Sequence, residues 1–128
     1  MAKIRIERDF HDLYRKLGGD DESTGSGEAP FSTMKEVFML SVVLGANKRD
    51  RLPLSNPREV FDESVLKARD LTILRAIALV ESGDIHILQD ESTVLRMAQE
   101  YANTGIRIIR DRLEATELVQ SISHLFIT

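Results

Sequence analysis

The chain has 128 residues, of which 42% are hydrophobic, 30% charged and 5% aromatic, and its formal net charge is −4. This length predicts one domain, and this composition predicts a soluble globular protein with a mostly aliphatic core. The absence of cysteine excludes a disulfide framework, a thiolate nucleophile and a cysteine zinc site, while the acidic balance does not favour a nucleic-acid-binding domain, which is usually basic.

The N-terminal segment alternates apolar and charged residues over positions 1–8, with Ile4 and Ile6 on one side. This pattern fits a short strand or an extended arm. We expect a flexible arm, because no second strand is evident to pair with it. A short helix is predicted over residues 9–17, and Gly18 to Pro30 reads as a mobile, acidic linker that cannot bury enough apolar surface to become ordered.

The first core helix is predicted to begin near Ser32 or Thr33, because Thr33 and Glu36 match a capping box. It is apolar on nearly all sides, which predicts a central position covered on several sides, and Gly45 and Asn47 should end it. A basic, proline-punctuated loop follows over residues 48–57. Within it, Asn56 and Pro57 look like the start of a short helical turn that runs to Phe61.

Three further helices are predicted over residues 65–81, 91–113 and 116–126, with Gly83 ending the first and Asp90 capping the second. The last is amphipathic and could complete the core or form a subunit interface. The expected fold is therefore all-α, a compact bundle of four to five helices with a flexible N-terminal arm. Residues 1–30 would form the arm, short helix and linker, and residues 31–128 the helical core domain.

The third long helix contains the unfavourable run Asn103, Thr104 and Gly105 in its middle. Glycine costs about 1 kcal/mol relative to alanine in a helix interior. Such a run predicts a break in the helix, or a point where another backbone or a ligand comes close. Close helix packing at Gly105 is the preferred interpretation.

No catalytic motif is evident. His11, His86 and His124 lie in separate segments without a metal-ligand spacing, and Ser41 is expected to bond its own i−4 carbonyl. We therefore expect no enzyme activity, no metal and no cofactor. Without a signal peptide or an apolar run of membrane-spanning length, a cytoplasmic location without membrane contact is expected.

Two groups of basic residues are candidates for contact with DNA phosphates. The first group, in the loop, is Lys48, Arg49 and Arg51, and the second, in the third long helix, is Arg107 and Arg110. Arg107 and Arg110 face the same way on a helix. The competing interpretation is a solvated helix face, on which Asp111 and Glu114 neutralise these arginines, and charge runs usually have this role.

Four segments occur in a fixed order along the chain, and they are Pro30–Phe38, Val43–Arg49, Ala76–Asp84 and Glu100–Arg110. Together these strings resemble the Dnd system-associated protein 4 family, whose members are small bacterial proteins linked to DNA phosphorothioation gene clusters. The resemblance covers residues 31–113. The order of parts is also similar to the small helical DndE protein of the same pathway. That likeness implies an α-helical, oligomeric protein that contacts the DNA backbone.

Two functions remain open from the sequence. The first is a non-enzymatic accessory protein of a phosphorothioation modification and restriction system, a phage-defence system, that acts through contacts with other proteins of that system. The alternative is a DNA-binding module that uses the basic loop and helix. Because the two central helices carry more apolar surface than a chain of this size easily covers, we also expect a homo-oligomer.

Overall fold

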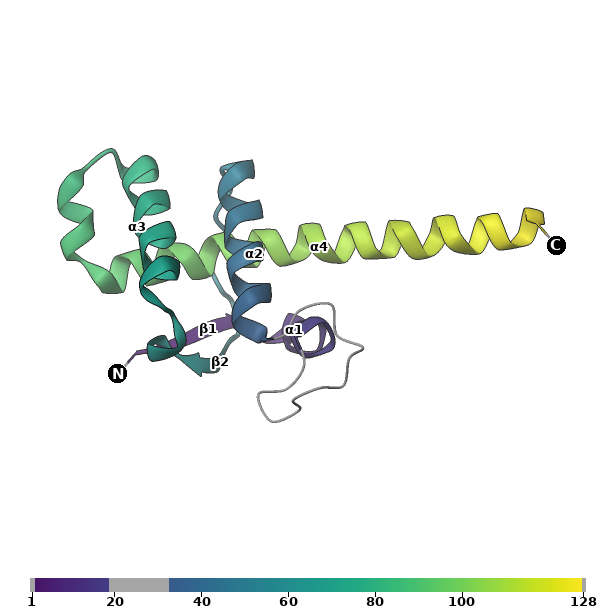
Figure 1. Ribbon diagram of the computed structural model, residues 1–128, viewed down its shortest axis with the longest axis horizontal. Coiled ribbons are helices and arrows are strands. Elements are labelled where there is room, and N and C mark those ends of the chain that lie inside the picture. Colours follow the sequence, from purple (N-terminus) through teal and green to yellow (C-terminus); the bar gives the residue numbers. More distant parts are fainter. Residues whose placement is uncertain (1, 19–32, 128) are drawn as a thin grey trace.

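The computed structural model describes residues 2–18 and 33–127, and the side chains of this part except those of residues 119 and 121–127. The described part contains four α-helices and one two-stranded sheet (Figure 1). A single long helix, α4, runs the whole length of the molecule, and α2 and α3 lie across it. The sheet and α1 lie on the side of α4 where α2 begins. The predicted linker, Gly18 to Pro30, falls outside the described residues apart from Gly18 itself.

The N-terminal segment is a strand and not a flexible arm. Strand β1 (Lys3–Glu7) pairs antiparallel with β2 (Pro57–Asp62), with Ile4 opposite Phe61. Ile4 and Ile6 are fully buried, as the alternation predicted for a strand. The expectation of an all-α fold is therefore wrong in this respect, and so is the helical turn predicted from Asn56 and Pro57. A pairing between residues 50 to 59 positions apart in the chain leaves no signal in either segment alone.

The first helix continues the core that the sheet begins. After a 3₁₀ turn at Arg8–Phe10, α1 covers His11–Gly18 and buries Tyr14 and Leu17. These residues join the same hydrophobic core as α2 and α4. Residues 3–18 are thus packed onto the helical core and not decoupled from it.

Helix α2 (Met34–Lys48) starts as predicted, because the Thr33 hydroxyl accepts a hydrogen bond from the Glu36 amide at 3.2 Å. The helix runs past its predicted end at Gly45 and Asn47 and stops at Arg49, whose φ of 58° places it in the left-handed region. The helix buries one side completely, including Phe38 and Val42, but leaves Val43 exposed. It is therefore covered on fewer sides than its all-round apolar sequence predicted.

Helix α3 (Ala68–Ser82) begins three residues later than predicted, where the Asp70 carboxylate accepts a hydrogen bond from the Lys67 amide at 2.8 Å. Lys35 of α2 also binds Asp70, at 2.9 Å, and so ties the starts of the two helices together. Gly83 ends α3 with a φ of 68°, as its predicted C′ position requires.

Helix α4 (Glu91–Ile127) has 37 residues and replaces the two helices predicted for this region. Asp90 caps it by accepting hydrogen bonds from the amide and hydroxyl of Thr93. At 1.5 Å per residue the helix is about 55 Å long. No glycine or proline stands between Leu113 and Thr116, so nothing in the local sequence ends the helix there.

Candidate functional site

Contrary to the predicted break, the run Asn103, Thr104 and Gly105 does not interrupt the helix. α4 is continuous through these residues, and all three are buried. Gly105 lies where α4 crosses α2, and a Cβ at this position would overlap the backbone carbonyl of Ser41. On the other helix, a Cβ on Gly45 would overlap the backbone carbonyl of Tyr101. The two glycines thus allow the two backbones to touch.

Asn103 joins α4 to the loop that follows α2. Its amide nitrogen lies 3.1 Å from the Leu52 carbonyl oxygen and 3.4 Å from that of Pro53, so it donates to this loop. Its side-chain oxygen accepts a hydrogen bond from Arg107 at 3.3 Å. The buried asparagine therefore satisfies backbone groups that would otherwise lack partners.

Glu7 is a buried carboxylate that could not be predicted from the sequence pattern. It lies near enough to Arg107 to be affected by its charge. It is 3% exposed and accepts hydrogen bonds of 2.9 Å from the amide and hydroxyl of Ser55 and from the amide of Asn56. Burial by itself raises the pKa of Glu7, but these donors and the charge of Arg107 outweigh it, so the pKa is lowered. The signal in the sequence was misleading, because strict alternation places Glu7 on the solvent side of β1.

The predicted basic residues fall into two separate places. Arg107 and Arg110 both stack on the ring of Phe10, with guanidinium carbons 4.9 and 5.3 Å from its centroid. Arg110 also forms an ion pair of 3.0 Å with Asp111, its sequence neighbour. Both arginines are half-buried and held by contacts within the chain.

The other three basic residues lie at the far end of α2, which Figure 1 shows on the opposite side of α4 from α1. Arg51 forms ion pairs of 3.6 Å with Glu81 and with Glu100. Lys48 and Arg49 are exposed and have no ion pair with any residue that the structure describes. The fold therefore does not gather the five residues into one surface, and only two of them project freely.

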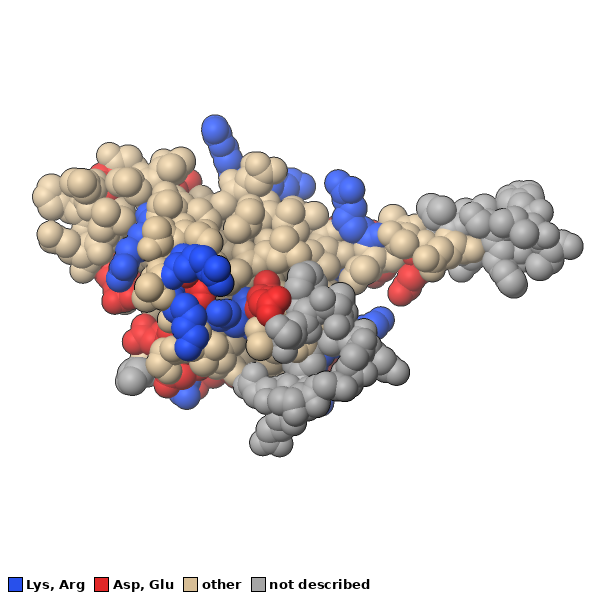
Figure 2. All heavy atoms as spheres, viewed as in Figure 1, with Lys and Arg blue, Asp and Glu red and all other residues tan. Residues whose placement is uncertain are grey.

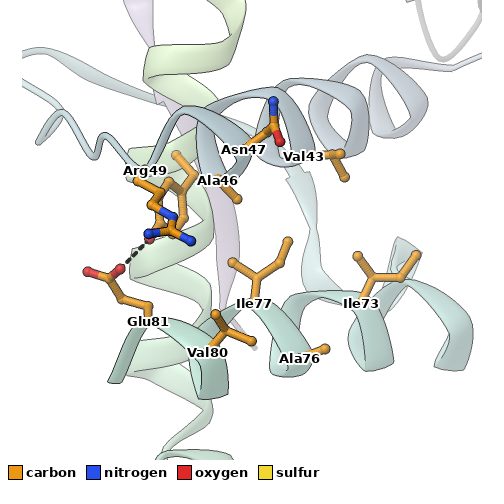
Figure 3. A pocket seen from close by; sticks show the side chains of 10 residues that line it. Val43, Ala46, Asn47, Arg49, Ile73, Ala76, Ile77, Val80 and Glu81 are labelled. Atoms are coloured by element: carbon orange, nitrogen blue, oxygen red, sulfur yellow. Dashed lines mark hydrogen bonds between the residues drawn. The ribbon is translucent and has the colours of Figure 1, made fainter. Parts of the chain in front are cut away.

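An apolar hollow lies between α2 and α3, and we call it the α2–α3 groove. Its volume is about 740 Å³. Its walls are aliphatic, as Figure 3 shows: Val43 and Ala46 face it from α2, and Ile73, Ile77 and Val80 from α3. Val80 is 83% exposed and Val43 44%. Such a surface costs free energy in water unless a partner covers it.

One end of the α2–α3 groove is polar. Here the Tyr101 hydroxyl donates a hydrogen bond of 2.8 Å to Glu81, and Arg49 lies above them (Figure 3). Burial and the neighbouring Glu81 carboxylate raise the pKa of Tyr101 to about 12, so the hydroxyl keeps its proton at neutral pH. On the face seen in Figure 2, the surface over the upper parts of α2 and α3 is largely uncharged, whereas charged side chains gather over their lower ends. A basic side chain projects from the upper end of α2.

The end of α4, residues 111–127, protrudes from the rest of the molecule, and we call it the α4 tail. Figure 1 shows it extending beyond every other element. All described side chains from Asp111 to Leu118 are exposed, and Leu118 is 61% exposed. The tail therefore contributes little to the core that the described residues form.

Within the described ranges, no group of three histidines or carboxylates is arranged to hold a metal ion. No described helix combines the length and the apolar character needed to cross a membrane. What the described geometry offers is an exposed apolar groove and two exposed basic side chains, Lys48 and Arg49, that form no ion pair with the described residues.

Comparison with known protein families shows which family the chain belongs to. Residues 3–128 match the family described as DNA sulphur modification system-associated protein 4. The chain belongs to this family. The match extends beyond the resemblance over residues 31–113 and includes β1 and α1, consistent with their packing in the core. No match was found among curated proteins or among solved structures.

Membership in this family associates the protein with a DNA sulphur modification system. It also suggests other proteins of that system as partners.

Proposed function

We propose that this protein is a non-enzymatic accessory component of a bacterial DNA phosphorothioation modification and restriction system, a phage-defence system, and that it acts through protein contacts. The observation that carries the proposal is the α2–α3 groove, with its aliphatic walls and its exposed Val80 and Val43. Grooves between two helices commonly receive the apolar face of a third helix. Family membership supplies the system in which the docking takes place.

The test is co-purification of the full-length, tagged protein with the products of the neighbouring phosphorothioation genes. We expect at least one product to be retained by the wild type and lost from the Val80→Asp variant. Since Val80 is 83% exposed, this substitution does not disturb the core. Ile85→Asp is the matched control, because Ile85 is 65% exposed and does not line the groove. Equal retention by all three proteins would refute the groove as the docking site.

The alternative function, contact with the DNA backbone, is supported by Lys48 and Arg49, which are exposed and not paired with any described residue. Binding through phosphates weakens with salt by a slope of about −0.9 per contact. A Lys48→Gln, Arg49→Asn variant, in which asparagine tolerates the left-handed backbone of Arg49, should lower that slope by about 2. Arg112→Gln is a control outside the candidate set. No binding to duplex DNA at low salt would exclude this alternative.

A further inference from the structure

We infer that Glu81 is a positioning residue that keeps the α2–α3 groove open. Its carboxylate holds the last turn of α3 against α4 and against the loop that follows α2. Glu81 thereby serves the proposed function, on which this inference rests in one respect, that the groove is a docking site. What Glu81 contributes is the width of the groove before a partner arrives.

The last turn of α3 has no buried side chain of its own. Helix α3 is anchored in the core by Leu74 and Ala78, which are 2% and 1% exposed. From Leu79 to Ser82 no residue is buried, and Val80 is 83% exposed. Packing therefore fixes the middle of α3 more firmly than its end, and the position of this end depends on polar contacts.

Glu81 supplies these polar contacts through both of its carboxylate oxygens. Oε2 accepts a hydrogen bond of 2.8 Å from the Tyr101 hydroxyl, and Oε1 lies 3.6 Å from Nε of Arg51. Both partners are held in place, because Tyr101 is 2% exposed and Arg51 precedes Leu52, whose amide donates to the Glu100 carbonyl of α4 at 3.2 Å. A hydrogen bond to a carboxylate is about twice as strong as one between neutral groups, so Glu81 attaches α3 firmly.

The two walls of the groove attract each other in water, because both are apolar and exposed. Ile77 and Val80 point from α3 toward α2, and Val43 of α2 is 44% exposed (Figure 3). At the other end of the groove, Lys35 and Asp70 fix the start of α3 with an ion pair of 2.9 Å. The end of α3 that carries Glu81 is therefore the end that can swing toward α2.

The Glu81 contacts hold the two walls apart without filling the space between them. Without this carboxylate, Val80 should approach α2 and narrow the groove. A partner would then have to separate the two helices before it could dock, whereas the tied form is pre-organised for docking.

The test measures the width of the groove in the full-length protein. The chain contains no cysteine, so spin labels can be attached to Lys48→Cys on α2 and Ser82→Cys on α3, which are exposed and do not line the groove. Double electron–electron resonance then gives the distance between the two labels. We expect Glu81→Ala to shorten the mean distance by a few ångströms. Glu91→Ala is the matched control, because Glu91 forms an ion pair of 3.5 Å with Arg75 of α3 away from the groove lining.

A second variant and a stability measurement separate positioning from a loss of structure. Tyr101→Phe removes only the hydroxyl donor, so it should shorten the distance by less than Glu81→Ala, since Arg51 still binds Glu81. Exposed ion pairs contribute little to stability, so the Tm of Glu81→Ala by circular dichroism should stay close to that of Glu91→Ala.

Three results would overturn the inference. They are an unchanged mean distance in Glu81→Ala, a distribution that broadens without a shorter mean, and an equal shortening in Glu91→Ala. The distance is measured on the protein alone, so it does not depend on whether a partner docks. A partner lost from Val80→Asp together with an unchanged distance in Glu81→Ala would leave the proposed function standing and refute the role of Glu81. A shorter distance without any retained partner would do the reverse.

Discussion

Replacing Gly105 by alanine tests the close crossing of α2 and α4 directly. In an isolated helix this change is favourable by about 1 kcal/mol, because alanine is the better helix former. In the folded protein the added methyl group meets the backbone of Ser41, which has no rotamer through which to move away. The two helices must separate, and the packing of Phe38 and Val42 against α4 loosens with them.

The expected size of the effect follows from these opposing terms. Overpacking a dense core costs about 1–3 kcal/mol, and more where the obstacle is backbone. We therefore expect Gly105→Ala to lower the free energy of unfolding by about 2 kcal/mol, and Tm by about 5–10 °C for a chain of this size. Urea and thermal unfolding followed by circular dichroism measure both quantities.

Two comparisons make the test specific. Gly83→Ala should cost about 1–2 kcal/mol through its left-handed backbone alone, because a Cβ at that position meets no atom of a residue that packs against it. Gly45→Ala meets Tyr101 at the same crossing, so it should be less than additive with Gly105→Ala. If Gly105→Ala left stability unchanged or increased it, as helix propensity alone predicts, the close crossing would be refuted.

Two further predictions concern the buried polar groups. Glu7→Gln should lower the free energy of unfolding at neutral pH by about 2–3 kcal/mol, since it removes the charge that three donors satisfy. Because the pKa of Glu7 is lowered on folding from 4.5, its stabilising effect is present above about pH 4.5 and is lost as the pH falls through the folded value. The variant should lack this part of the acid dependence, and an identical acid profile would contradict the assignment. Asn103→Ala should cost about 1–3 kcal/mol and speed amide exchange in residues 50–56, because Leu52 and Pro53 lose the donor that ties them to α4. Unchanged exchange in this loop would show that the asparagine does not hold it.

The local sequence determined three of the helix ends, namely the starts of α2 and α4 and the end of α3. Thr33, Gly83 and Asp90 each act within one helical turn, so their capping roles could be predicted without knowing the fold. The same holds for Ser41, which bonds the carbonyl four residues before it at 2.8 Å. The four strings that carry the family resemblance were also present in the sequence itself, and the family match confirmed them.

The candidate site was predictable only in part. The all-round apolar sequence of α2 indicated surface in excess of one small core, but not that Val43 would face a groove shared with α3. The sequence identified the basic residues, but it did not show which carboxylates or rings they contact in the fold. Arg51 forms ion pairs with Glu81 and Glu100, and the guanidinium groups of two α4 arginines stack on the Phe10 ring. Each of these contacts joins segments that are distant in the sequence.

The sequence by itself determined the caps at Thr33, Gly83 and Asp90, the largely helical character and the family, because each depends on neighbouring residues or on the strings themselves. Only the tertiary structure decided that residues 3–7 pair with residues 57–62, that α4 continues through Gly105, and that the α2–α3 groove stays open. The physical reason is that packing against α2 outweighs the poor intrinsic helix propensity of Asn103, Thr104 and Gly105. Contacts of that kind are formed between segments far apart in the chain, and no local pattern contains them.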